Sequence, residues 1–314
     1  MHGSVCIRQG IVYVGNHARS ASVRTYDLDG HRLESGFAFG PSRAESGEEE
    51  RAAPGASATG LAVDDDHRVW VADPVGGRVR AFTLFGAELD GLPTDVLPGE
   101  SASSPVTGER QAESYVPSGV THGPVDVAAF GVEQDQVLLV GVRGGGRHAV
   151  RRWSPALQRG VSLRSFGDPK GRFQDVVGVA LDERLAFVCE ARPRRVQVFR
   201  DFDYHFTIEV PAARPGPSGA LPQPRAIAAL PDGRLVLALA GEPSGLLLLD
   251  SSGRLLRVLA EHGEDDGEVF HPSDVALEDA GADDRHKRLV VIDREGERVQ
   301  VFTVAGTCYG AFDV

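Results

Sequence analysis

The chain has 314 residues, 41% hydrophobic and 25% charged, and no apolar stretch reaches the about 18 residues that a membrane-spanning helix needs. Its 45 acidic and 33 basic residues give a net charge of −12. This sign disfavours a general affinity for nucleic acid, because phosphate binding needs a positive field. The N-terminus lacks the basic flank and apolar core of a signal peptide, so we expect a cytoplasmic protein. Three widely spaced cysteines, Cys6, Cys189 and Cys308, are expected to be reduced thiols.

Three short patterns recur in a fixed order along the chain. A small apolar trio occupies residues 5–7, 61–63, 127–129, 179–181, 227–229 and 275–277. A longer apolar run follows each trio, at 11–14, 69–72, 137–140, 185–188, 235–238 and 289–292. Next comes an alternating segment that usually ends on an aromatic residue, at 23–26, 79–82, 150–153, 196–199 and 299–302, with a wholly aliphatic copy at 246–249. A fourth segment follows a turn in several copies, at 32–33, 161–166 and 255–259.

Alternation with a period of two and β-branched residues indicates strands, and no stretch sustains a helical period. A four-stranded sheet cannot bury both of its apolar faces alone, whereas six such sheets stacked radially bury each face against a neighbour. We therefore predict an all-β fold, a six-bladed β-propeller of four-stranded antiparallel blades forming one domain over residues 1–314. The expected blades cover 3–40, 58–91, 123–167, 173–210, 221–262 and 270–314, with loop insertions at 41–57 and 92–122.

The order of the segments also predicts how the blades are filled and joined. The small trios suit innermost strands, which converge near the axis, and the aromatic residues of the third strands suit the wider space further out. The chain opens on a first strand and closes on a fourth, so we expect no exchanged strand to lock the ring.

The residues resemble those of the NHL-repeat β-propellers. The clearest match runs through 270–277, 288–293 and 298–302, and the resemblance extends over nearly the whole chain. It implies the propeller fold and says little about function, because such propellers serve as binding platforms and, in relatives, as enzymes. It also implies a structural role for the acidic residues that end second strands, Asp73, Asp293 and Glu190. These would accept amides of the turns, with Arg78 or Arg298 as partner.

The mouth of the central channel is the expected place for a ligand, because residues just before each first strand converge there. Aligning the trios places these residues at equivalent positions: Gly60, Asp126, Gly178, Ala226 and Asp274. Asp126 and Asp274 belong to opposite blades, and His122, His271 and Arg225 lie just upstream of the corresponding trios. Asp126 and Asp274 are the candidate ligands of a calcium or zinc ion. A second possible role for this group is that of a catalytic acid and base. Alternatively, each aspartate caps its own turn by accepting nearby backbone amides.

Catalytic motifs such as a nucleophile elbow, a phosphate loop or a spaced zinc motif are absent from the sequence. We therefore favour a non-enzymatic propeller without a cofactor, acting as a scaffold that binds another protein or a peptide. The alternative is a metal-dependent hydrolase or lyase, lactonase-like, with its site at the channel mouth. RNA binding is a minor alternative and would use the only dense basic cluster, made of Arg143, Arg147, Arg151, Arg152 and Trp153.

Overall fold

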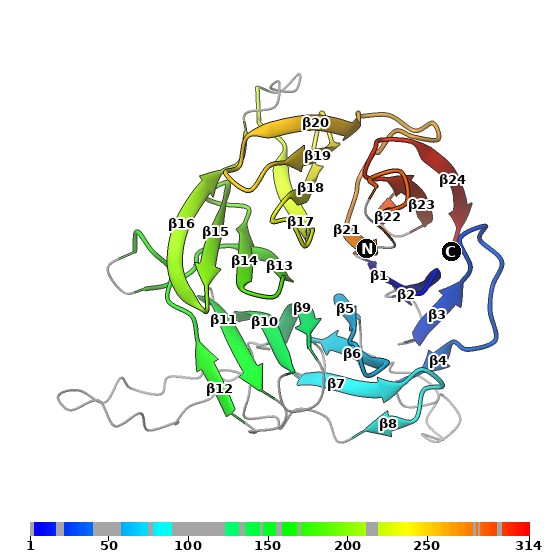
Figure 1. Ribbon diagram of the computed structural model, residues 1–314, viewed down its shortest axis with the longest axis horizontal. Helices are drawn as coiled ribbons and strands as arrows, with labels where there is room; N and C mark the ends of the chain where they lie inside the picture. Colours follow the sequence, from blue (N-terminus) through cyan, green and yellow to red (C-terminus); the bar gives the residue numbers. More distant parts are fainter. Residues whose placement is uncertain are drawn as a thin grey trace, which may run out of the picture.

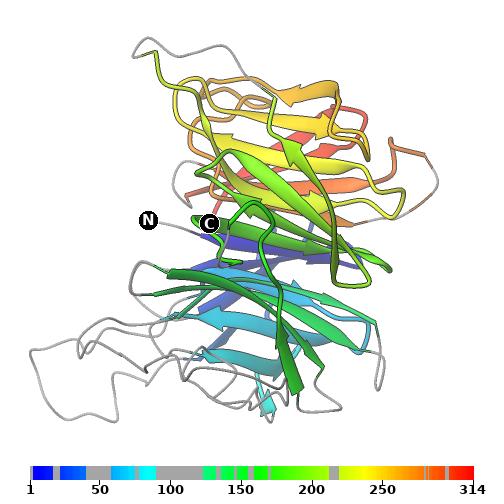
Figure 2. The ribbon, with the colours of Figure 1, turned by 90° about the vertical axis from the view of Figure 1, so that its left-hand side faces the viewer.

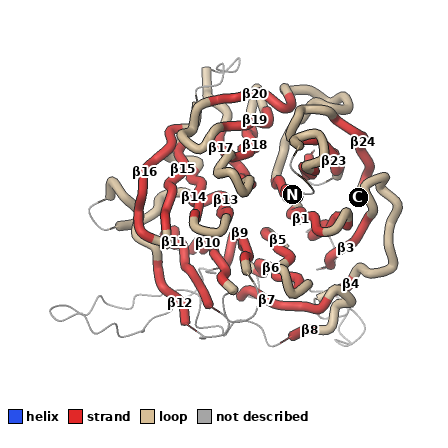
Figure 3. Tube along the Cα trace, in the orientation of Figure 1, coloured by secondary structure: helices blue, strands red, loops and turns tan. Residues whose placement is uncertain are grey.

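The computed structural model describes residues 3–16, 22–39, 58–74, 78–89, 123–131, 136–144, 147–154, 159–168, 171–211, 219–278, 281, 283–293 and 297–314. In these residues every regular element is a strand, and the strands form six four-stranded antiparallel sheets arranged around a central axis (Figures 1 and 3). The predicted all-β, six-bladed propeller is confirmed. No helix in these ranges is long and apolar enough to cross a membrane.

The blades are numbered 1 to 6 in chain order. Blade 1 consists of β1 (Ser4–Arg8), β2 (Ile11–Asn16), β3 (Ser22–Tyr26) and β4 (Phe37–Ala38), and blade 2 of β5 (Gly60–Val63), β6 (Arg68–Asp73), β7 (Arg78–Thr83) and β8 (Glu88–Leu89). Blade 3 consists of β9 (Gly123–Phe130), β10 (Val137–Gly144), β11 (Arg147–Ser154) and β12 (Arg159–Ser162), and blade 4 of β13 (Val176–Leu181), β14 (Leu185–Glu190), β15 (Arg195–Arg200) and β16 (Asp203–Glu209). Blade 5 consists of β17 (Gln223–Ala229), β18 (Leu235–Ala240), β19 (Gly245–Leu249) and β20 (Leu255–Ala260), and blade 6 of β21 (Asp274–Glu278), β22 (Arg288–Asp293), β23 (Arg298–Thr303) and β24 (Cys308–Asp313).

The hydrophobic core is divided among six clusters, each lying between two neighbouring blades. Figure 2 shows neighbouring sheets stacked face to face, and each sheet contributes buried side chains to two of the six clusters. Inner strands contribute small side chains such as Ala62 and Ala180, and third strands contribute the fully buried rings of Phe82, Phe199 and Phe302. Each such ring removed from water contributes about 1.5–3 kcal/mol. Side chains become larger from the axis outwards, as the space between neighbouring blades does. This gradient lets the interior reach the packing density that is usual for proteins.

The ring closes where blade 6 meets blade 1, and no strand is exchanged, because β1 to β4 form one sheet and β21 to β24 another. Closure depends on noncovalent contacts along the whole of β1. The Oγ of Ser273 donates to the carbonyl oxygen of Gly3 over 3.2 Å, and the Gly10 amide donates to the Glu278 carboxylate over 3.1 Å. Between these two ends lies an apolar cluster that includes Val5 and Ile292.

The fourth strand of blade 1 differs from the expected one. Residues 32–33 were expected to form it, but Arg32 makes only an isolated bridge to Tyr26, and the outer strand is β4. The reason is packing, because the Phe37 ring contacts the Phe82 ring of blade 2 at a centroid distance of 4.8 Å. The expected insertions, 41–57 and 92–122, lie wholly outside the described residues.

Candidate functional site

Six equivalent positions surround the axis where the inner strands begin. They are occupied by Ser4, Gly60, Asp126, Gly178, Ala226 and Asp274. Four of these residues are small, as the crowding near the axis requires. At Gly60 a Cβ atom would lie 2.6 Å from the Cα of Asp126 and 2.9 Å from the amide nitrogen of Val127. The two aspartates are therefore the only large polar groups at these six positions.

Both aspartates connect two blades through the same pair of hydrogen bonds. The Oδ1 of Asp274 accepts the amide of Val275 in its own strand, and Oδ2 accepts the amide of Val5 in blade 1, both over 2.8 Å. In the same way Asp126 accepts the amide of Val127 in its own strand and the amide of Val179 in blade 4, again over 2.8 Å. The expected local capping is present, and the second bond makes each carboxylate a link between neighbouring blades.

The environment of these carboxylates opposes their ionisation. Burial raises the pKa of Asp274 to about 7, although the amides of Val5 and Val275 and the charge of Arg225 act in the opposite direction. Burial, followed by the negative charge of Asp274, raises the pKa of Asp126 well above its ordinary value. Low-dielectric surroundings and a like charge both favour the neutral acid. The pair therefore holds a proton more readily than exposed carboxylates do.

Arg225 lies at a β-bulge, where an extra residue interrupts the pairing of β17 with β18 between Pro224 and Ala226. Blades 3 and 4 have bulges at the same place, and the extra residues there are Val125 and Val177. Bulges re-aim side chains and are frequent beside functional sites. Of these three blades, blade 5 alone places a cation at the bulge, and that cation acts electrostatically on Asp274.

Of the two histidines expected at the mouth, only His271 lies within the described residues. The backbone amide of His271 donates to Oδ1 of Asp293 over 2.8 Å, and its ring packs edge-on against Phe270 with centroids 4.4 Å apart. The His271 ring makes no hydrogen bond to Asp126 or Asp274 in the part of the chain that the structure describes. His122 lies outside the described residues, so its expected place at the mouth stays a prediction.

Two of the three acidic residues that end second strands, Asp293 and Glu190, have the structural role that the resemblance implied. Asp293 accepts the amides of Phe270 and His271 and pairs with Arg298 over 2.7 Å. Glu190 likewise accepts the Gln174 amide and pairs with Arg195 over 2.7 Å. The accepted amides belong to the linker before the inner strand of the same blade, rather than to the turn that follows the acid. Each buried acid thus fixes the path by which the chain enters its blade.

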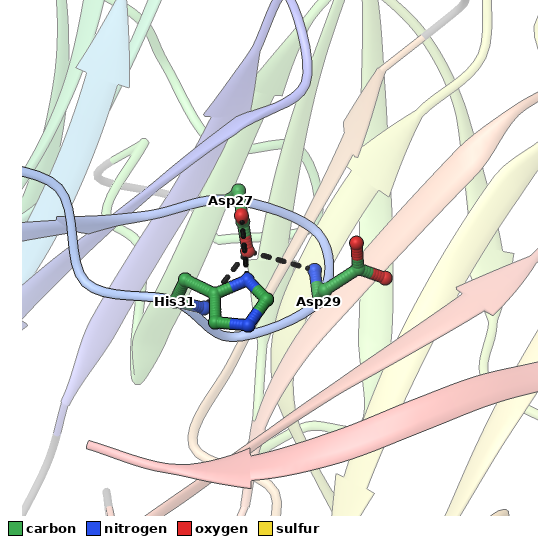
Figure 4. Close-up of side chains that lie close together, drawn as sticks. All are labelled: Asp27, Asp29 and His31. Carbon is green, nitrogen blue, oxygen red and sulfur yellow. Dashed lines mark hydrogen bonds and ion pairs between the residues drawn. The ribbon is translucent and has the colours of Figure 1, made fainter.

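One group of potential metal ligands, which sequence reasoning missed, is found among the described residues, and it lies in the exposed turn after β3 (Figure 4). Oδ1 of Asp27 accepts the amides of Asp29 and His31, and Oδ2 contacts Nδ1 of His31 at 2.9 Å. Asp250 organises the turn after β19 in the same manner, accepting the amides of Ser252 and Arg254. Because this pattern recurs with an arginine in place of the histidine, the turn itself accounts for the cluster.

In the basic cluster of blade 3, the one aromatic residue does not form a stacking surface. Trp153 is only 5% exposed and packs in the core between blades 2 and 3. The guanidinium of Arg152 lies over the Phe202 ring, 4.1 Å from its centroid. The Trp153 ring is therefore closed to a nucleic-acid base, which removes the one aromatic residue of that cluster from the expected RNA surface.

Two of the three cysteines behave as buried hydrophobic groups. Cys6 and Cys189 lie in β1 and β14, and burial raises the pKa of both thiols. A protonated thiol is a poor nucleophile. Cys308 is half-buried, and burial raises the pKa of its thiol as well.

No family model matches the chain, and no curated protein matches its sequence. Solved structures do match its fold. A chain of a nidogen–laminin complex is 13% identical with a TM-score of 0.57, and the match covers 100% of this chain and 93% of that one. A gluconolactonase from Xanthomonas campestris is 14% identical with a TM-score of 0.53, covering 98% and 83%. The calcium-binding protein regucalcin from Agrobacterium tumefaciens is 12% identical with a TM-score of 0.57, covering 94% and 83%. At these identities the likeness shows the fold alone.

Proposed function

We propose that this propeller is a non-enzymatic scaffold that binds another protein or a peptide. The channel mouth supports a structural use of its carboxylates, because every carboxylate oxygen of Asp126 and Asp274 already accepts a backbone amide. Among the described residues no third ligating side chain comes close enough to these two to complete a metal site. A zinc ion would need at least that third ligand from the protein. The residues present therefore do not favour a resident zinc ion.

The observation that carries this proposal is a run of exposed residues on β20, the outer strand of blade 5. The run is apolar except for Arg257, whose guanidinium donates to the carbonyl oxygen of Ala305. Leu255, Leu256 and Val258 are 42%, 43% and 44% exposed, and β20 pairs with another strand on one side only. The outer strand of blade 4 differs, because its most exposed positions, Asp203, His205 and Glu209, are polar. Soluble proteins normally protect an outer strand with charges, and an apolar one attracts another polypeptide. These three residues of β20 are called the β20 patch below.

Solved structures of this fold are consistent with a binding role. One is a nidogen–laminin complex, and another, 11% identical with a TM-score of 0.58, belongs to the outer coat vertex of COPII on membranes. In these two assemblies propellers of similar fold occur together with other proteins. The proposal itself depends on the β20 patch, because likeness at such identity carries no partner over to this chain.

The test compares which proteins the full chain retains from a lysate with what two variants retain. Leu256→Glu/Val258→Glu charges the β20 patch, and Val161→Glu is the matched control, because Val161 is an exposed apolar residue of another outer strand, β12. We expect a discrete partner that the wild type and the control retain and the patch variant loses. A third variant without residues 92–122 tests whether this insertion contributes to capture. Equal retention by all variants would contradict the proposal.

A metal-dependent hydrolase or lyase remains the second candidate, and the raised pKa of Asp274 is the observation that favours it. A carboxyl that titrates near neutral pH can exchange a proton during catalysis. Two similar folds are a gluconolactonase and a calcium-binding protein. Elemental analysis of the purified chain for calcium, zinc and manganese tests this candidate. Near-stoichiometric metal that disappears in both Asp126→Ala and Asp274→Ala would place it first, and absence of metal after soaking would remove it.

A further inference from the structure

A cavity of about 450 Å³ opens on blade 6, and part of its wall comes from the linker that directly follows β20 in the sequence. Four acidic residues line it, three from the linker between blades 5 and 6 and one from the end of β24. They are Glu264, Asp265, Asp266 and Asp313, and the remaining wall includes Arg298 and Phe312. This cavity is called the acidic pocket. Its size is within the range of natural ligand sites.

The arginine in the wall does not neutralise the acidic pocket. Arg298 is 5% exposed and its Nη2 forms an ion pair with the fully buried Asp293 over 2.7 Å. Its nearest acidic group in the pocket, Asp266, lies 3.8 Å away and is 71% exposed, so that contact is screened by water. The field in the pocket is therefore negative.

Arg298, which lines the pocket, also has one buried hydrogen-bond donor without a partner among the described residues. Its Nη1 and Nη2 donate to the carbonyl oxygens of Glu264 and Glu268, over 2.7 and 3.2 Å. The Nε–H is buried and has no partner among the described residues. A buried donor without an acceptor costs about 1–3 kcal/mol. An incoming carbonyl oxygen would remove that cost, which is a reason for a ligand here that is independent of the acidic residues.

Two of the carboxylates are available to a ligand. Within the described residues, the side chains of Asp265 and Asp313 take part in no hydrogen bond or ion pair. No three ligating atoms of these acids lie within 4.8 Å of one another, so the pocket lacks the close cage that a small metal ion requires. Separated carboxylates in a larger cavity suit an ammonium or guanidinium group, which carries several donors.

We propose that the acidic pocket receives a lysine or arginine side chain from an extended, basic segment of a partner protein. This inference rests on the proposed function as a binding scaffold and adds the chemistry of what is bound. Asp265 and Asp313 would hold the cationic group, and the half-buried Phe312 offers an apolar wall to its aliphatic stem. The Nε–H of Arg298 would donate to a backbone carbonyl oxygen of the same segment. A polypeptide supplies the cation and the acceptor together.

The experiment measures binding of the full chain to a short fluorescent peptide with two adjacent arginines, by anisotropy at low and at physiological salt. The comparison peptide has citrulline in place of both arginines. The variant Asp265→Asn/Asp313→Asn removes two charges from the pocket, and Asp203→Asn/Glu209→Gln removes two from exposed positions of β16. We expect the wild-type chain to bind the arginine peptide. The pocket variant should bind this peptide about tenfold more weakly, and the β16 variant should bind it with unchanged affinity.

A nuclear magnetic resonance titration adds a readout at the donor, because the Nε–H signal of Arg298 should shift when the arginine peptide is added. The proposal is overturned if both variants weaken binding equally, if the citrulline peptide binds as well, or if neither peptide binds. These results leave the capture experiment on the β20 patch untouched. A retained partner that depends on the β20 patch, with no peptide binding, would mean that the scaffold function holds and the acidic pocket does not serve it.

Discussion

Oδ2 of Asp274 accepts a hydrogen bond from the amide of Val5 over 2.8 Å, joining two residues that are 269 positions apart. The equivalent bond from Val179 to Asp126 joins blades 3 and 4, which the chain already connects. The two bonds are chemically alike, but only the first lies where the ring has no covalent continuity. This difference allows the contribution of ring closure to be measured against an internal reference.

Asp274→Ala should loosen the junction of blades 6 and 1. Two amides lose their acceptor, a loss of about 1–3 kcal/mol for buried donors, and β1 has no chain connection to blade 6 that would limit its opening. We expect faster amide hydrogen exchange throughout β1 and β24. Asp126→Ala is the matched control and should accelerate exchange only near Val127 and Val179. Equal acceleration of β1 in both variants would contradict a special role for the junction.

The stability of the fold should fall as the pH rises from about 4 to about 7. The pKa of Asp274 is 3.8 in its ordinary state and about 7 in the folded protein, so the folded state binds more protons than the unfolded state in this window. Protonation of Asp274 therefore contributes on the order of 1–3 kcal/mol to the free energy of unfolding below this window. The contribution is lost as the pH rises through the folded pKa. Urea unfolding at pH 5 and pH 8 measures it.

Asp274→Asn should reduce this pH dependence, because the amide does not titrate. Asp203→Asn, at an exposed position of β16, should leave the dependence as it is in the wild type. A wild-type stability that is the same at both pH values would show that Asp274 titrates near its ordinary pKa.

Gly60→Ala should destabilise the protein by about 1–3 kcal/mol, as overpacking of a close backbone contact does. The added Cβ would lie 2.6 Å from the Cα of Asp126, and backbone atoms cannot move aside cheaply. Gly310→Ala in β24 is the control, because nothing lies within 4 Å of a Cβ there. Thermal unfolding of both variants checks the difference, and equal melting temperatures would refute the close approach at the axis.

Asp293→Ala should cost about 3–5 kcal/mol, because it leaves Arg298 as a buried, uncompensated charge. The double variant Asp293→Ala/Arg298→Met should recover part of that loss, since an apolar side chain needs no counter-ion. Denaturant unfolding of the wild type, the two single variants Asp293→Ala and Arg298→Met, and the double variant gives the coupling. An Asp293→Ala variant as stable as the double variant would mean that the ion pair contributes little.

The fold could be predicted from the sequence because the residue patterns that determine it are local and repeated six times. Period-two alternation, small trios and third-strand aromatic residues such as Phe82 and Phe302 each follow from the space available at one radius of the ring. The same repetition identified Asp126 and Asp274 as exceptional, because they interrupt a series of small residues. The resemblance that named Asp293 and Glu190 as structural came from the same local patterns.

The exceptions to this success involve contacts between blades. Phe37, rather than residues 32–33, marks the outer strand of blade 1, because a ring in blade 2 selects it. His271 donates its backbone amide to Asp293 and packs its ring on Phe270. Its predicted part in a ligand site at the mouth stays a prediction.

By itself the sequence determined the number of blades, the order of strands within each blade and the absence of an exchanged strand, because these depend on short-range alternation and on where the repeats begin. Only the tertiary structure decided what the polar residues do. Asp274 is a link to Val5 because ring closure brings together two ends of the chain. The linker acids meet Asp313 and the unused Nε–H of Arg298 because the linker folds back over blade 6. Both arrangements join residues distant in sequence, and such pairings leave no periodic signal.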